Sequence, residues 1–241
     1  MHYLDVAKPL VVVLAPMCRP FGPRASLNRS INPDAWLESY QHAAPHGRFC
    51  GHVAKRQVLN SRYFLNEQPF PSELYLETPW EEVRNMPGVL NIVFDQCRTG
   101  LVTAQGGIIR KPTELVSNSE ELLIPFVGLI CNGGHVHLEL AGSALSSAAQ
   151  VWTWDMSQRI VSGIMALKRK HLKDIAPNRL IASASSARGR VGAGRPAAPR
   201  RLDQAGINKL CPLRLARIVL ASATHPGAHT AAGSRTLVRS K

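Results

Sequence analysis

The sequence lacks the features that mark membrane proteins and secreted proteins. No stretch reaches the about 20 apolar residues that a membrane-spanning helix needs. The apolar run that begins at Leu10 is short, is followed by Pro16 and Arg19, and has no clear signal-peptide cleavage pattern. The 5 cysteines show no spacing typical of a disulfide framework. We therefore expect no membrane partner and a cytoplasmic or nuclear location.

The last third of the chain is almost without acidic residues and has no aromatic residue. Residues 168–241 hold 16 Lys and Arg but only 2 Asp and Glu, whereas residues 1–167 hold 13 Lys and Arg and 14 Asp and Glu. Such a segment buries too little apolar surface to offset the entropy of the chain. We predict a folded domain over 1–167 and a basic, low-complexity, mostly disordered tail over 168–241. A weakly populated basic helix over 213–223 is possible within that tail.

A buried strand is predicted near the start of the chain. The five large apolar residues from Leu10 to Leu14 are typical of a strand that is buried on both faces, and Pro16 ends it. Cys18 then lies just beyond the carboxyl end of the strand, where open α/β sheets build their sites. The alternative is an ordinary buried cysteine, because free cysteine is among the most buried residue types.

Two further blocks place charged residues beside predicted strands. A short apolar strand leads into Glu67 and ends at Pro69. A third strand, over 89–97, is followed by a turn and by a basic segment that contains Arg110 and Lys111. The alternatives are a solvent-facing Glu67 and a β-hairpin with a cationic edge.

The order of these blocks, beginning with Met-Cys-Arg-Pro-Phe-Gly at 17–22, resembles the C5-cytosine DNA methyltransferases. The resemblance implies that Cys18 is the nucleophile toward a flipped cytosine, that Glu67 contacts a ring nitrogen, and that Arg110 supports the site. Met17 stands where the family has proline, and no Gly-x-Gly follows a strand before Cys18. We therefore expect an incomplete module that has no cofactor of its own. It would use S-adenosylmethionine only if the missing half were supplied.

Basic residues at and beyond these positions are candidates for contact with nucleic acid. They are Arg19 and Lys111, and in the tail Arg188, Arg190, Arg200 and Arg201. Lys and Arg neutralise phosphates and release counterions without sequence choice. Nucleic acid is therefore the expected partner, and a non-catalytic nucleic-acid-binding protein that acts through its tail is the alternative function.

The periodicity of the remaining residues predicts an α/β domain. Helices are predicted from Asn32, and over 51–60, 80–85, 119–124 and 143–167. The last of these carries an apolar stripe at steps of three or four residues, which we expect to be core: Ala149, Trp152, Met156, Ile160, Ile164 and Leu167. The rest of 23–51 is predicted to be loop. The helix between the Glu67 strand and the Phe94 strand suggests a βαβ unit with parallel strands. The fold class that we predict is an incomplete Rossmann-like parallel sheet with helices, followed by the disordered basic tail.

One short segment offers metal ligands. Cys131, His135 and His137 lie within seven residues, and all three are plausible zinc ligands. A structural zinc site needs a fourth ligand, for which Cys97 is the candidate. The alternative is a Gly-Gly turn into a strand with two outward histidines. The sequence alone favours this alternative, so no metal is predicted.

The segment from Phe94 to Met165 resembles a block in some retroelement polyproteins. The resemblance rests on Asp95-Gln96-Cys97, Gly100, Lys111-Pro112-Thr113, Asn118-Ser119, Cys131, His135, His137 and Gly142-Ser143-Ala144. It implies that the chain is a piece of a mobile-element polyprotein whose other parts are its partners. The expected function is that of a truncated, inactive methyltransferase-like module for nucleic acid.

Overall fold

The computed structural model describes residues 1–138, 149–187 and 219–222. Most of the tail predicted over 168–241 lies outside these residues, so its disorder stays a prediction. The predicted boundary at residue 167 falls inside a helix, α7 (Trp154–Ala187). None of the helices in the described part of the chain combines the length and the apolar character needed to cross a membrane.

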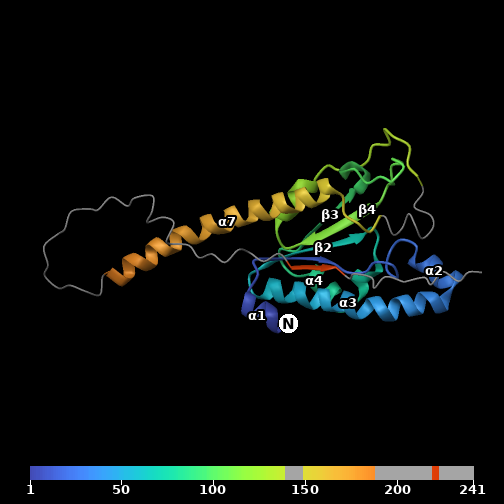
Figure 1. Ribbon diagram of the computed structural model, residues 1–241. Helices are drawn as coiled ribbons and strands as arrows, with labels where there is room; N and C mark the ends of the chain where they lie inside the picture. The colour runs from blue at the N-terminus through green and yellow to red at the C-terminus, as the bar shows by residue number, and fades with distance from the viewer. Residues whose placement is uncertain (139–148, 188–218, 223–241) are drawn as a thin grey trace, which may run out of the picture.

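A mixed β-sheet forms the middle layer of the fold (Figure 1). Its strands are β1 (Val11–Ala15), β2 (Tyr63–Pro69), β3 (Leu90–Asp95), β4 (Pro112–Ser117) and β5 (Val219–Ser222), in the order β3-β4-β2-β1-β5. β1 pairs parallel with β2 and β5, whereas β4 pairs antiparallel with β2 and β3. The α/β class is confirmed, but the purely parallel sheet is wrong. After β3 the chain reverses into β4, so the β-hairpin of the alternative interpretation is present, but β4 lies between β2 and β3 and is not an edge strand.

Two long helices cover the opposite faces of the sheet, α3 on one and α7 on the other (Figure 1). Helix α3 spans Pro33–Leu59, and the shorter helices of the described residues are α1 (His2–Ala7), α2 (Ala25–Ile31), α4 (Trp80–Arg84) and α5 (Glu120–Leu123). Short 3-10 turns are η1 (Glu73–Leu76), η2 (Gln96–Thr99) and η3 (Ile124–Phe126). The predicted helices near 80–85 and 119–124 are therefore confirmed, the second being completed by η3.

Helix α3 is much longer than predicted. It begins after Asn32, whose side chain accepts a backbone N–H hydrogen bond of 3.1 Å in the first turn, as its capping preference indicates. The helix then runs through Pro45, so the loop predicted over 23–51 is wrong. Small residues allow close packing here: a Cβ on Gly47 would lie 2.6 Å from Leu74 Cδ1. Tertiary contact thus overrides the weak helix preference of this segment.

The side chains of β1 alternate between two hydrophobic cores. Val12 and Leu14 pack with α3 and α4, whereas Val11 and Val13 pack with α5 and α7. Strict alternation into two apolar layers explains why the strand is a continuous apolar run. The apolar stripe predicted on the last helix is confirmed as core, through Met156, Ile160, Ile164 and Leu167.

Two predictions for the C-terminal part of the chain differ from the structure. The helix predicted over 143–167 begins only at Trp154, and residues 143–148 lie outside the described residues. Within the helix considered for 213–223, residues 219–222 form β5 and the others lie outside the described residues. The β5 residues pair with the apolar strand β1, which a local helical pattern does not reveal.

Candidate functional site

The loop that carries Cys18 is fixed to the end of β2. The Cys18 carbonyl oxygen accepts hydrogen bonds from the N–H groups of Phe21 and Gly22, at 3.0 and 2.9 Å, which closes a tight turn. The fully buried Gln68 side chain donates from Nε2 to the Pro16 carbonyl oxygen at 2.8 Å. Because β1 and β2 are parallel neighbours, their carboxyl ends lie at the same edge of the sheet.

Cys18 is half-buried among charged neighbours. Burial raises the pKa of its thiol, the Lys111 ammonium acts in the opposite direction, and the Glu67 carboxylate adds to the rise. The thiol is therefore protonated at neutral pH, and it needs a base before it can act as a nucleophile.

Glu67 is buried, so its interpretation as a solvent-facing residue is wrong. Its Oε1 lies 3.4 Å from Lys111 Nζ and 3.5 Å from Gln96 Nε2, and its Oε2 accepts from Trp152 Nε1 at 3.3 Å. Lys111 also donates to the Ala149 carbonyl oxygen at 3.1 Å. We call Cys18, Glu67, Gln96, Lys111 and Trp152 the strand-end cluster. No sequence pattern identified Gln96 or Trp152 as a partner of Glu67.

The other predicted site residues lie elsewhere. Arg110 is half-exposed and pairs with Asp95, its Nε lying 3.1 Å from Asp95 Oδ1, so that Lys111 rather than Arg110 reaches Glu67. Arg19 is exposed and lines a shallow pocket with Trp36. The tail arginines, Arg188, Arg190, Arg200 and Arg201, lie outside the described residues.

A second cluster joins η2 to the loop that follows η3. Cys97, Cys131, His135 and His137 each bring one ligand atom, and these four atoms lie within 4.8 Å of one another. Cys131 Sγ is 3.6 Å from His135 Nε2 and 3.4 Å from His137 Nε2. We call these four residues the Cys-His cluster. The interpretation of this segment as a strand with two outward histidines is wrong. Residues 129–137 are a loop, and both imidazoles face the Cys131 sulfur.

Backbone hydrogen bonds hold both ends of the loop over 129–137, which we call the Cys-His loop. The Asp95 N–H donates to the Leu129 carbonyl oxygen at 2.9 Å, and the Leu138 N–H donates to the Ile108 carbonyl oxygen at 2.8 Å. Asp95 Oδ2 also accepts from the Cys131 N–H at 2.8 Å. The loop is therefore tied to the end of β3 and to the segment that precedes Arg110.

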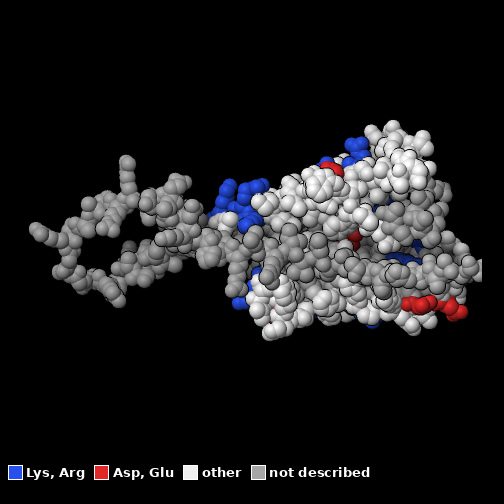
Figure 2. All heavy atoms as spheres, viewed as in Figure 1, with Lys and Arg blue, Asp and Glu red and all other residues white. Residues whose placement is uncertain are grey.

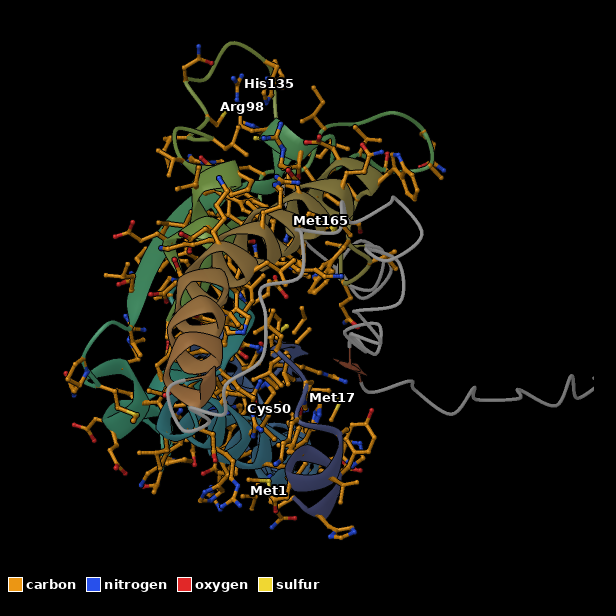
Figure 3. All side chains as sticks on the ribbon, turned by 90° about the vertical axis from the view of Figure 1, so that its left-hand side faces the viewer. Met1, Met17, Cys50, Arg98, His135 and Met165 are labelled. Atoms are coloured by element: carbon orange, nitrogen blue, oxygen red, sulfur yellow. The ribbon has the colours of Figure 1, made fainter. Side chains whose placement is uncertain are left out.

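Within the Cys-His cluster the two sulfurs influence each other. Burial raises the pKa of Cys97 to about 11, and its contact with Cys131 adds to the rise. All four side chains are half-buried, so the cluster is partly open to solvent. In Figure 3, His135 and Arg98 lie together at one end of the molecule, apart from Met17 beside the Cys18 loop.

The two clusters use neighbouring residues of the same two segments. Gln96 and Lys111 serve the strand-end cluster, whereas Cys97 belongs to the Cys-His cluster and Arg110 contacts the Asp95 that supports it. Movement of either segment would therefore affect both clusters. No protein-family model, curated protein or solved structure matches the chain.

Proposed function

We propose that the strand-end cluster holds a pyrimidine base of a nucleic acid, in the manner of an incomplete, Rossmann-like C5-cytosine methyltransferase half within a retroelement polyprotein. One observation supports this most. Cys18 follows β1, Glu67 lies within the adjacent parallel strand β2, and both are at one edge of the sheet. In this proposal Cys18 faces the ring, Glu67 binds a ring nitrogen, and Lys111 holds the Glu67 carboxylate.

The polar groups of the strand-end cluster suit a heterocycle that carries both donors and acceptors. The contacts of Glu67 with Lys111, Gln96 and Trp152 are long, between 3.3 and 3.5 Å, so its carboxylate keeps capacity for another partner. Gln96 is fully buried, and its Oε1 has no hydrogen-bond partner in the structure. Cytosine offers an amino donor, which such an acceptor could bind.

The proposed chemistry of Cys18 is limited to addition to the ring. The Cys18 thiol transfers its proton to a solvent base, and its sulfur bonds to a ring carbon, which breaks the ring double bond. The electron pair of that bond moves through the ring to the nitrogen beside Glu67, and this nitrogen takes a proton from water, so that the thiol has added to the ring. No Gly-x-Gly turn follows β1, β2 or β3. The proposal therefore includes no methyl-transfer step by these residues.

Protection of Cys18 from alkylation tests the proposal. The full chain is treated with iodoacetamide in the presence of a single-stranded oligocytidine or of an abasic strand of the same length, and Cys18 labelling is measured by peptide mass spectrometry. We expect the cytosine strand alone to slow labelling, and Glu67→Gln to remove the difference. Equal labelling with both strands, at concentrations where both bind, would overturn the base-binding role.

A second function, binding of nucleic acid through basic residues, is favoured by the surface of α7. Lys and Arg gather on the middle of this helix (Figure 2). The residues are Lys168, Arg169, Lys170 and Lys173. Lys170 pairs with Glu121, whereas Arg169 and Lys173 are exposed and Lys168 is half-buried, so the charges of these three residues can reach a phosphate backbone.

Salt dependence tests this second function. Each phosphate contact removed should reduce the slope of log affinity against log salt by about 0.7 for single-stranded nucleic acid. We expect Lys168→Gln, Arg169→Gln and Lys173→Gln together to weaken binding and lower the slope, whereas Cys18→Ser leaves both unchanged. An unchanged slope in the triple variant would exclude α7 from the contact.

A further inference from the structure

We propose that Cys97, Cys131, His135 and His137 bind one structural zinc ion. Tetrahedral zinc has Zn–S distances of about 2.3 Å and Zn–N distances of about 2.0–2.1 Å, which place a sulfur and a nitrogen ligand about 3.5 Å apart. The distances from Cys131 Sγ to the two imidazole nitrogens, 3.6 and 3.4 Å, match this separation. The sulfur of Cys97 completes four ligand atoms within 4.8 Å.

The chemistry of the four ligands selects the metal. Two thiolates and two imidazoles are soft and borderline ligands, which zinc binds in closed, four-coordinate structural sites. Two thiolates also neutralise the charge of a divalent ion. Because four protein ligands fill a tetrahedral shell, no position is left for a reacting water, and the site is structural rather than catalytic.

The surroundings of Cys131 support a thiolate ligand. The Gly133 N–H lies 3.4 Å from Cys131 Sγ, in a turn where Gly133 adopts a φ of 78° that favours glycine. The Cys131 N–H is held by Asp95, which also binds Arg110. Such outer contacts orient the ligands of metal sites.

A metal would supply the stability that the loop does not obtain from apolar packing. The loop over 129–137 has no regular secondary structure, and its apolar side chains are largely in solvent, with Val136 88% and Ile130 54% exposed. A zinc ion would cross-link this loop to η2. Binding free energy is then available for ordering the loop, as in small metal-stabilised domains.

The zinc site would also fix the segment that leads to the strand-end cluster. The Leu138 N–H donates to the Ile108 carbonyl oxygen, and a Cβ on Gly107 would collide with Leu138 Cδ1, so the loop packs closely on the segment before Arg110. The inference itself does not depend on base binding, because it rests only on the four ligands and their loop.

Metal analysis of the full chain is the first test. The purified chain, stripped with a chelator and reloaded with zinc, is analysed by plasma mass spectrometry, and zinc affinity is measured by competition with a chromophoric chelator. We expect about one zinc ion per chain. Reloading with Co²⁺ should give the visible bands of tetrahedral cobalt with sulfur charge transfer. A folded chain that retains no zinc and gives no such bands would overturn the proposal.

Single substitutions then assign the ligands. We expect Cys97→Ser, Cys131→Ser, His135→Gln and His137→Gln each to lower zinc affinity by more than the roughly 10- to 100-fold loss that follows removal of an outer contact. His52→Gln is the matched control, because His52 is exposed on α3. If zinc affinity were unchanged in all four variants, zinc would be bound elsewhere and this site would be excluded. The wild-type measurement decides the question even if a variant fails to fold.

Discussion

Lys111 and Glu67 form an ion pair between the start of β4 and the neighbouring strand β2, with 3.4 Å between Lys111 Nζ and Glu67 Oε1. Their side chains are only 10% and 9% exposed. Lys111 lies just before β4, whereas Glu67 lies within β2. The attraction is strong at such burial, but so is the cost of removing both charges from water. The free energy of unfolding should therefore fall most when only one of the two partners is removed.

Loss of one partner of this pair should be strongly destabilising. We expect Lys111→Met to reduce the free energy of unfolding by about 3 to 5 kcal/mol, because the Glu67 carboxylate would stay buried without its cation. The double variant Glu67→Gln and Lys111→Met should recover part of that loss. Urea unfolding followed by circular dichroism measures both.

The pair of Lys170 and Glu121, in which the cation lies in solvent, provides the control for this prediction. Its atoms lie 2.5 Å apart, but the Lys170 side chain is 58% exposed. Lys170→Met should therefore change the free energy of unfolding by only about 0 to 1 kcal/mol. Additive effects of the Glu67 and Lys111 substitutions would show that the buried pair is not coupled.

Alkylation of Cys18 should depend on pH as expected for a raised pKa. Only the thiolate reacts, and burial moves the pKa of this thiol above its ordinary value of 9.0. At pH 8 we expect slower iodoacetamide labelling of the folded chain than of the urea-unfolded chain, with the folded rate still rising above pH 9. Lys111→Met should move the profile to higher pH, because the ammonium favours the thiolate. A folded profile centred below pH 9 would contradict the assignment.

Asp95→Asn should loosen the Cys-His loop. Asp95 accepts from the Cys131 N–H and from Arg110, and one of its two acceptor oxygens becomes an amide donor in the variant. If the loop holds zinc, its affinity should fall about 10- to 100-fold, as for other outer contacts. Competition with a chelator measures this loss. Asp155→Asn, which affects only a surface pair with Arg159, should leave zinc affinity unchanged.

Gly163→Ala should disturb the packing of α7 on α5. A Cβ at this position would lie 2.7 Å from the Glu121 carbonyl oxygen, and backbone cannot move aside as a flexible side chain can. Overpacking of this kind costs about 1 to 3 kcal/mol, which thermal or urea unfolding would detect. Ser162→Ala, at an exposed position one residue earlier on the same helix, should be nearly neutral. Equal stability of the two variants would show that the helices separate easily.

Strong local patterns predicted much of the fold. The apolar run into Cys18 identified β1, and the stripe from Met156 to Leu167 identified the core face of α7. Helix α3 was underestimated because Pro45 and Gly47 weaken its local signal, while their role depends on contacts made by the folded chain. The insertion of β4 between β2 and β3 likewise depends on long-range pairing, which no local pattern encodes.

The candidate sites were predicted only in part. Sequence order placed Cys18 and Glu67 at one sheet edge, but Trp152 lies 85 residues from Glu67, so their contact has no local signature. The alternation His135-Val136-His137 imitated a strand, whereas the left-handed turn at Gly133 bends the segment into a loop. The fourth ligand, the sulfur of Cys97, comes from a different element, and only the folded chain brings it to the histidines.

The division of β1 between two cores has a geometric consequence for the thiol. If β1 slipped by one residue along its neighbours, Val11 and Val13 would exchange faces with Val12 and Leu14, and both cores would receive the wrong side chains. Packing on both faces of the sheet thus fixes the register of β1. Since Cys18 follows so closely after the strand, its position at the sheet edge is set by four valine and leucine side chains that lie in the two cores.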